Sequence, residues 1–425
     1  MDKRFSKLFS LSEDRAIALL QTPLDQLDDP SDRYVAACHL IHYPTQRSID
    51  ALVAAVENDE DDLYNRIARR KSLESLGRLK AATALPTISA CLSDSDIYTV
   101  ENAVWAIGEI GTDDEKILEE ITQLLGKPNQ SYRVIIQVLA KLDDRNAIDA
   151  IQPFIDSEDQ SISSAAIAAV SQLSGDVSQM DRVVAFLQSD DINARRACIQ
   201  DLMDTCYYPA MPAIVRCPVS IVFRLRGLRH LAEKGIAAGE FTFAEVEPYF
   251  DRVILDYPDT LEFVHEYDQT PSLEFAINEL YSTDFGRCYL GSATLLEVYR
   301  QELPQALLDT FAAKAYNDYG GHYHVIKLLG WLQYAPAYDL VVEALNNQAP
   351  QFQKSRAAAA IALGQIGNTE AIPLLHQALE TQIFDLKYAA LLALEQLGDR
   401  QGAEECTGDS DLILSEKAMA LRGRE

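Results

Sequence analysis

The densest group of side chains able to move protons lies between residues 314 and 332. A carboxylate, phenols and imidazoles surround a pair of glycines there, at Tyr316, Asp318, Tyr319, Gly320, Gly321, His322 and His324. Carboxylate, phenol and imidazole groups act as general acids and bases when a protein sets their pKa values near the working pH. This stretch is therefore the first candidate for acid–base chemistry.

The second half of this stretch predicts a helix. Its apolar residues recur at i, i+3, i+4 and i+7, at Val325, Leu328, Leu329 and Leu332. Gly320 and Gly321 predict a flexible turn that leads into this helix from residues 317–319. His324, Lys327 and Trp331 lie off the apolar stripe, so we expect them to face a ligand. The alternative is an ordinary helix cap followed by polar surface residues.

A second candidate surface lies on a helix predicted near residues 98–110. Tyr98, Glu101, Asn102 and Trp105 share one face of it, whereas its apolar stripe occupies another. Aromatic rings beside a carboxylate and an amide suit a flat, conjugated ligand with polar edges. The alternative is that the two rings pack on the neighbouring helix pair and that Glu101 is solvated.

Cationic residues gather locally in a chain that is otherwise acidic. One cluster consists of Arg66, Arg69, Arg70, Lys71, Arg78 and Lys80, and a second of Arg216, Arg224, Arg226 and Arg229. Arg66 and Arg70 share a helix face and can bind a carboxylate or phosphate through paired guanidinium hydrogen bonds. The alternative is ion pairing with nearby acids such as those at 59–62.

The composition excludes several classes of function. With 37 Lys and Arg against 65 Asp and Glu, the net charge of −28 repels nucleic acid. No apolar run approaches the roughly 20 residues of a membrane span, and the first residues lack the apolar stretch of a signal peptide. The seven cysteines are scattered, as is typical of reduced thiols. We expect a cytoplasmic protein without an integral membrane segment.

The sequence also gives little support for a metal site. His322 and His324 point about 200° apart on a helix, and no cysteine or further histidine lies near them in the sequence. We therefore predict no metal, and a metal-dependent hydrolase is disfavoured. No phosphate-cradling glycine loop or nucleophile elbow is present in the sequence.

A repeat of helix–turn–helix units organises the chain. A short motif ends the first helix of each unit and recurs at intervals of 31 to 34 residues, as residues 76–79, 107–110, 139–142 and 170–173, and later as 329–332, 363–366 and 394–397. Such units bury their apolar faces only by stacking, which predicts an all-α, HEAT-like α-solenoid with one long curved surface. The period is lost near residues 216–320, so we predict repeats in 1–215, an irregular helical segment in 216–320, and repeats with a polar tail in 321–425.

Three stretches resemble the E/F-type phycobilin lyases of cyanobacteria, namely residues 98–110, Tyr281–Tyr289 and Asn317–His324. The last two are similar in particular to the single-chain lyases and lyase-isomerases that act on the α subunit of phycoerythrin. The resemblance implies attachment of phycoerythrobilin, as substrate and without a further cofactor, to a cysteine of the apo-phycoerythrin α subunit through a thioether. The nucleophile then belongs to the partner, and none of the seven thiols is required. Transient carriage of the pigment on Cys288 is left open.

With such a ligand, the crowding of polar groups beside the two glycines and the candidate surfaces above suggest roles for particular residues. Asp318 is expected to hydrogen-bond the pyrrole nitrogens, with Tyr319, His322 and His324 as the other catalytic groups that give or take protons. The bilin is expected to lie against Arg66, Arg70, Tyr98, Glu101, Asn102, Trp105, Arg287, Tyr289, Tyr316 and Trp331. Proton-transfer groups outnumber what plain addition requires, which favours additional isomerisation to phycourobilin. The competing interpretation is a non-catalytic HEAT-repeat adaptor or chaperone for a phycobiliprotein.

Overall fold

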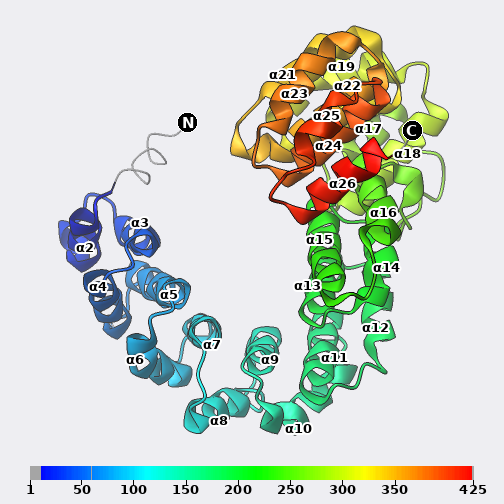
Figure 1. Ribbon diagram of the computed structural model, residues 1–425. Coiled ribbons are helices and arrows are strands. Elements are labelled where there is room, and N and C mark those ends of the chain that lie inside the picture. The colour runs from blue at the N-terminus through cyan, green and yellow to red at the C-terminus, as the bar shows by residue number, and fades with distance from the viewer. Residues whose placement is uncertain (1–10, 59, 424–425) are drawn as a thin grey trace. The chain divides into compact units, whose positions relative to one another are not determined.

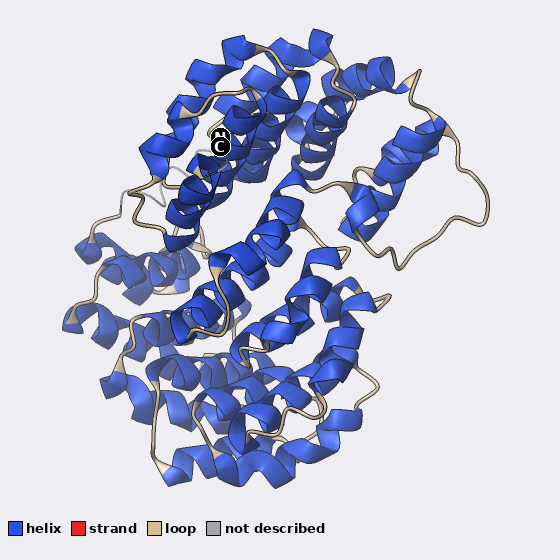
Figure 2. Ribbon diagram, turned by 45° about the vertical axis from the view of Figure 1, so that its right-hand side comes forward, coloured by secondary structure: helices blue, strands red, loops and turns tan. Residues whose placement is uncertain are grey.

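The computed structural model describes residues 11–58 and 60–423, in which every regular element is a helix (Figures 1 and 2). The chain forms two compact units, Met1–Met180 and Asp181–Glu425. Both sequence-based boundaries, after residues 215 and 320, fall inside the second unit, because they mark repeat regularity and not contact density. In the described ranges, no helix is both long and apolar enough to cross a membrane.

The first unit stacks its helices in two layers (Figure 1). One layer consists of α3 (Asp32–His39), α5 (Leu63–Arg78), α7 (Ile97–Ile110), α9 (Tyr132–Lys141) and α11 (Gln160–Ser174). The other consists of α2 (Glu13–Gln21), α4 (Gln46–Glu57), α6 (Leu85–Ala90), α8 (Glu115–Leu124) and α10 (Ile148–Ile151). The row curves within this unit so that α5, α7 and α9 line its inner side. The predicted α-solenoid is confirmed.

The second unit contains the remaining helices. Its first part consists of α12 (Met180–Ala185), α13 (Ile192–Asp204), α14 (Met211–Arg216), α15 (Ile221–Ala238), α16 (Phe243–Leu255), α17 (Leu273–Glu279), α18 (Phe285–Val298) and α19 (Leu303–Ala313). A regular stack follows, made of α20 (Tyr319–Trp331), α21 (Tyr338–Asn346), α22 (Gln353–Ile366), α23 (Ile372–Leu379), α24 (Phe384–Gln396), α25 (Gln401–Cys406) and α26 (Leu412–Arg422). Helices α20, α22 and α24 lie side by side in this stack, so the period is regained where the sequence predicts it.

The repeated motif owes its glycine to close contact between neighbouring first helices. A Cβ on Gly77 of α5 would lie 2.8 Å from the Cα of Ala106 in α7. In the second unit, a Cβ on Gly330 of α20 would lie 2.8 Å from the Cα of Ala362 in α22. These distances are shorter than a carbon–carbon contact allows, so glycine lets the two backbones touch and fixes the spacing between units.

Aspartate begins many of the helices. Its carboxylate accepts hydrogen bonds from first-turn backbone N–H groups at Asp62, Asp96, Asp114, Asp159, Asp191, Asp284, Asp318 and Asp411. An anion at a helix N-terminus satisfies unpaired donors and interacts favourably with the helix dipole. Part of the acidity of the chain is therefore used to start helices.

We predict that Gly77→Ala lowers the free energy of unfolding by about 1–3 kcal/mol, because the added methyl group forces α5 and α7 apart. The measurement is urea unfolding, followed by the helix signal in circular dichroism at about 222 nm. Gly126→Ala is the matched control, because its Cβ would approach only the carbonyl oxygen of Gln123, at 3.6 Å. Equal unfolding midpoints for the two variants would contradict this account of the motif.

Candidate functional site

Asp318 is the N-terminal cap of α20. Its Oδ1 accepts hydrogen bonds from the backbone N–H groups of Gly320 at 2.9 Å and Gly321 at 2.7 Å. The predicted turn at residues 317–319 does lead into the helix, with Asp318 just outside it, but the helix begins at Tyr319, so both glycines lie in its first turn. Gly321 is needed for space: its Cβ would come within 2.4 Å of the ring of Tyr281. The helix-cap alternative is therefore confirmed for Asp318, and its catalytic role stays a prediction.

The two histidines of the stretch lie in the core. His322 packs between Phe311 and Phe352, at ring-centroid distances of 5.2 and 4.6 Å. His324 packs against Phe285 at 4.9 Å. Burial lowers the pKa of His322 to about 4 and, together with Lys354, the pKa of His324 to about 3. Both imidazoles are therefore neutral at pH 7 and have little access to solvent, so the geometry favours Asp318 and Tyr319 for proton transfer.

Helix α20 is covered on all sides, since every residue from 320 to 331 is buried. The expectation that His324, Lys327 and Trp331 face a ligand is therefore wrong, because neighbouring helices bury all three side chains. Trp331 stacks on Tyr257 with ring centroids 5.7 Å apart. The apolar stripe of the sequence marked one face correctly, but neighbouring helices bury the other faces as well. Only the start of α20 reaches solvent, where Tyr319 is 51% exposed.

A buried ionic cluster holds α20 in place. Asp256, at the C-terminal cap of α16, accepts hydrogen bonds from Arg224 of α15, Tyr289 of α18 and Tyr323 of α20. Lys327 lies 3.9 Å from the same carboxylate and donates to the carbonyl oxygen of residue 255 at 2.7 Å. All five side chains are buried. Four helices thus meet at one carboxylate.

The charges in this cluster are fixed by their neighbours. Burial alone would raise the pKa of Asp256, but Arg224 and Lys327 hold it below the usual value. Burial, followed by the nearby Asp256, raises the pKa values of Tyr289 and Tyr323, so both phenols stay protonated and donate. Burial lowers the pKa of Lys327 to about 8. Tyr289, expected to touch the ligand, is instead fully buried and joins α18 to this cluster.

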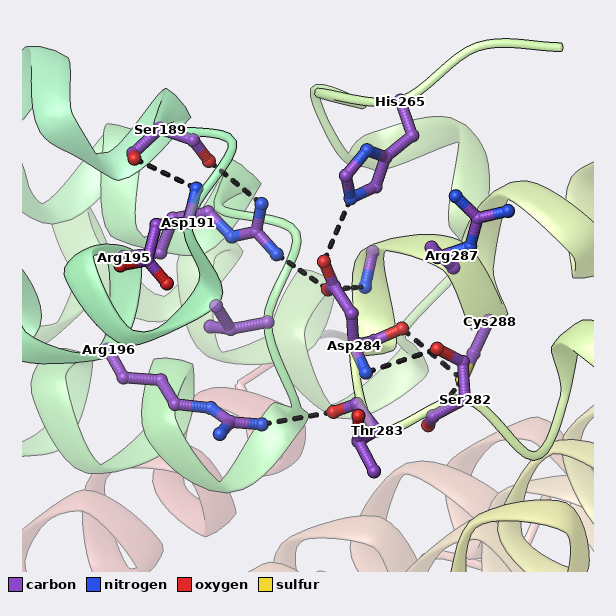
Figure 3. Close-up of polar contacts among 12 residues, drawn as sticks. Ser189, Asp191, Arg195, Arg196, His265, Ser282, Thr283, Asp284, Arg287 and Cys288 are labelled. Atoms are coloured by element: carbon purple, nitrogen blue, oxygen red, sulfur yellow. Dashed lines mark hydrogen bonds and ion pairs between the residues drawn. The ribbon is translucent and has the colours of Figure 1, made fainter.

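A second group of polar side chains surrounds the carboxylate of Asp284 (Figure 3). Its carboxylate receives Arg195 of α13 at 2.5 Å and His265 at 2.8 Å, and it also caps α18 through the N–H of Gly286 at 2.8 Å. A Cβ on Gly286 would lie 3.2 Å from the carbonyl oxygen of Pro218, so this position is tightly confined. The Tyr281–Tyr289 stretch thus joins α13, α18 and the loop that carries His265.

Two further residues of that stretch behave differently from each other. Cys288 is fully buried, and burial raises the pKa of its thiol to about 12. The thiolate needed to carry a pigment is therefore disfavoured, which argues against transient attachment at this residue. Arg287 pairs with Glu279 at 3.0 Å, and 40% of its side chain is exposed. It remains accessible to a carboxylate ligand.

In the first unit, the predicted aromatic face lies together on α7. Tyr98 is 55% exposed, and the guanidinium group of Arg70 lies 4.8 Å from its ring centre. Asn102 donates to the carbonyl oxygen of Tyr98 at 2.7 Å, and Glu101 accepts from Ser131 at 2.5 Å. Trp105 is half-buried on the same face. Because α5, α9 and the outer layer cover the other sides of α7, this face lies on the inner side of the first unit.

The cationic cluster of α5 is largely paired with acids, as the alternative interpretation proposed. Arg70 makes a two-point contact with Asp96 at 2.7 Å, Arg69 pairs with Asp94, and Glu74 receives both Lys71 and Arg78. Arg66 and Asp61 form an exposed pair at 3.6 Å. Of the expected acids at 59–62, Asp59 lies outside the described residues. A ligand carboxylate at Arg70 would have to compete with Asp96.

Two cavities lie near other residues discussed above. One of about 510 Å³ lies between the N-terminal ends of α5 and α7 and is lined in part by Arg66, Arg69 and Asp96. One of about 340 Å³ in the second unit is lined by Asp251, Tyr257 and neighbouring residues. Neither is lined by Asp318. Among the described residues, no group of three or more His, Cys, Asp or Glu side chains is arranged to hold a metal ion.

Comparisons with known proteins show what this chain is similar to. A family model for HEAT repeats matches residues 63–134 and 342–406. The chain is 55% identical to the "Uncharacterized phycocyanin operon protein Y" of Pseudanabaena tenuis, over 98% of this chain and 99% of that protein. It is 30% identical to the "Bilin biosynthesis protein CpeY" of a Synechococcus species, over 88% of this chain and 91% of that protein.

The chain belongs to the E/F-type bilin lyase family. A shorter relative, the "Phycocyanobilin lyase subunit alpha" of a Nostoc species, is 30% identical over 54% of this chain and 86% of its own length. A solved complex of CpcE and CpcF of phycocyanin lyase from Nostoc aligns with 57% of this chain and 94% of the matched chain, at 27% identity and a TM-score of 0.49.

In this bilin lyase homologue, the structure brings together groups that the sequence pattern did not connect. Asp256, Arg224 and Lys327 are separated by tens of residues and meet only through packing. Lys354, at the start of α22, lies over the ring of Tyr319. The sequence marked Asp256 only weakly, as an acid between a predicted apolar helix and Tyr257-Pro258. Nothing in the local sequence marks Lys354.

We predict that Asp256→Asn lowers the free energy of unfolding by about 3–5 kcal/mol, because it leaves Arg224 and Lys327 buried without a counter-charge. Urea unfolding measures the loss. Lys327→Met should cost less, since Arg224 still neutralises Asp256. The exposed Asp309→Asn is the control and should change stability by less than about 0.5 kcal/mol. A small loss for Asp256→Asn would show that the cluster does not hold the four helices together.

The buried histidines predict a pH dependence. A histidine with a lowered pKa binds fewer protons when folded than when unfolded, so it destabilises the fold as pH falls from about 6.5 to its folded pKa of about 4, by about 1.4 kcal/mol per pH unit. His322→Phe, which suits the aromatic surroundings, should flatten the fall in stability between pH 6.5 and 5. His376→Gln is the control of opposite sign, because nearby Glu405 and Asp399 raise the pKa of His376 despite partial desolvation. An unchanged pH profile for His322→Phe would refute the burial argument.

Proposed function

We propose that this protein is a bilin lyase that attaches a linear tetrapyrrole to a cysteine of a phycobiliprotein subunit. The observation that carries the proposal is its similarity, over 88% of the chain, to a protein named for bilin biosynthesis, together with the match of about half the chain to phycocyanobilin lyase subunits. The helical solenoid supplies a scaffold with long inner surfaces, on which a pigment and a protein partner can both be held.

The reaction needs no oxidant or metal. The sulfur of the acceptor cysteine forms a bond to the ring A ethylidene carbon of the pigment, and the thiol proton is balanced by protonation of the conjugated system. An acidic side chain near the pyrrole nitrogens favours the protonated, more electrophilic pigment. Asp318 suits this role because its Oδ1 is fixed by two backbone N–H groups, while Oδ2 makes no hydrogen bond within residues 11–58 and 60–423.

The more specific proposal is that the pigment is phycoerythrobilin and the acceptor is the α subunit of phycoerythrin. The Tyr281–Tyr289 and Asn317–His324 stretches support it through their resemblance to the single-chain lyases of that subunit. We further propose isomerisation to phycourobilin. Moving the double bond delivers one proton and removes another, so it needs an acid and a base, for which Asp318 and the exposed Tyr319 lie next to each other.

Co-expression tests these proposals. The chain is produced together with a phycoerythrobilin-forming pathway and a phycoerythrin α subunit, and the products are separated on a denaturing gel. A lyase leaves fluorescent pigment covalently on the subunit, whereas a non-catalytic adaptor leaves the subunit no more fluorescent than when the chain is omitted. The absorption spectrum then distinguishes the two reactions, because a product absorbing as phycoerythrobilin shows ligation without isomerisation.

We predict that Asp318→Asn slows ligation at least about ten-fold while the protein stays folded. Asparagine keeps the oxygen that caps α20 but loses the negative charge, so stability and catalysis are separated. Asp309→Asn on the neighbouring α19 is the matched control, since it removes one carboxylate charge without touching the start of α20. The assay is the rate of pigment attachment with the acceptor in excess. Full activity in Asp318→Asn would show that its role is only structural.

A further inference from the structure

Lys354 of α22 is a cation without a carboxylate partner. Its Nζ lies 4.0 Å from the ring centre of Phe285, 4.7 Å from that of Tyr319 and 5.0 Å from that of Tyr323. The side chain is half-buried. Among the described residues no acid lies within ion-pair distance of it, and Asp256 and Asp318 act on its charge only from farther away. Most other cations discussed above are paired with acids, so Lys354 differs from them.

The position of Lys354 in its helix is also unfavourable for a cation. It is the second residue of α22, which has 14 residues and whose N-cap, Phe352, offers no side-chain acceptor. A helix N-terminus carries partial positive charge and unpaired N–H groups, so it favours an anion and disfavours a lysine. The neighbouring α20 shows the usual solution, because Asp318 caps it. An added anion at the start of α22 would satisfy both the helix end and the ammonium group.

Buried polar atoms beside Lys354 also lack partners. Ser355, the next residue of α22, is 0% exposed, and its Oγ makes no hydrogen bond. His324 is 0% exposed, neither ring nitrogen is paired, and its ring packs against the same Phe285 and Tyr323 that surround Lys354. A buried polar group without a partner is destabilising, so the two unpaired nitrogens of His324 beside these rings indicate an incomplete polar site.

The chemistry favours a carboxylate as the missing group. Burial lowers the pKa of Lys354 to about 8, so the ammonium form still predominates at pH 7 and would be strengthened by an anion. A single lysine suits one negative charge. The net charge of −28 disfavours a polyphosphate, whereas a carboxylate on an otherwise apolar, conjugated molecule can approach the exposed ring of Tyr319.

We propose that Lys354, the rings of Phe285, Tyr319 and Tyr323 and the first turn of α22 form a carboxylate subsite that binds a propionate group of the tetrapyrrole. This inference rests on the proposed function and adds a substrate-binding residue to it. Because Tyr319 follows Asp318 directly, a propionate held at Lys354 brings the conjugated part of the pigment to the start of α20. The subsite therefore acts in binding and orientation, and Asp318 in proton transfer.

The test compares phycoerythrobilin with its dimethyl ester, in which both propionates are uncharged. Binding of each to the purified full chain is followed by the change in pigment absorption. The unmodified protein should bind the diacid at least ten-fold more tightly than the diester. Lys354→Met, which keeps the length of the side chain without its charge, should bind the diacid at least ten-fold more weakly and the diester unchanged. Lys354→Arg should restore most of the preference for the diacid.

Lys314→Met is the matched control, because the Lys314 ammonium lies 3.7 Å from the ring centre of Tyr281 but outside the proposed subsite. It should retain the preference of the unmodified protein. Equal diacid affinities for Lys354→Met and the unmodified protein would overturn the subsite and leave the lyase proposal standing. Failure of the unmodified protein to bind either pigment would overturn both. If Lys354→Met does not fold by circular dichroism, a missing preference for the diacid in the unmodified protein overturns the subsite, and a clear preference that Lys354→Arg retains supports it.

Discussion

The packing of α15, α16, α18 and α20 depends on the neutralisation of two buried cations by one carboxylate. Asp256 sits at the end of α16 with a left-handed backbone, φ 55°, and receives groups from α15, α18 and α20. Moving a charge from water into a protein interior costs several kcal/mol unless it is paired and hydrogen-bonded. Arg224 and Lys327 are therefore tolerated in the core only while Asp256 faces them. Because Tyr323 and Lys327 must reach Asp256, the cluster fixes where α20 lies along its axis and how it is rotated about that axis. The position of Tyr319 at its exposed end follows from this.

The two later stretches that resemble the E/F-type lyases turn out to build the fold as much as the site. In Tyr281–Tyr289, Asp284 joins separate helices, Gly286 makes room for a backbone carbonyl, and Tyr289 reaches Asp256. In Asn317–His324, Asp318 starts α20 and Gly321 admits the ring of Tyr281. Asp318, which starts α20, and the exposed Tyr319, a predicted ligand contact, are thus neighbours in the sequence.

Charge pairing gives this acidic chain a simple electrostatic rule. Aspartates start helices or neutralise arginines and lysines, as Asp96 does with both α7 and Arg70. A cation that lacks such a partner is then informative. Lys354 lies among rings at the positive end of a helix, next to buried groups without hydrogen bonds. The aromatic face of α7, with exposed Tyr98, offers a second surface of similar character within the first unit, although its arginine is already paired.

The sequence alone determined the class of fold, the helix pairs and the resemblance to the bilin lyases. Repeat spacing, apolar periodicity and short motifs are local properties that can be seen directly in the order of the residues. It also placed Tyr98, Asn102 and Trp105 on one face, since helical geometry follows from spacing. Only the tertiary structure decided that His322 and His324 are buried, that Asp256 lies against Arg224, and that Lys354 lies over Tyr319. These facts depend on which helices cover which faces. Contacts between residues that are tens of positions apart produce no repeating pattern in the sequence, so the sequence could not predict them.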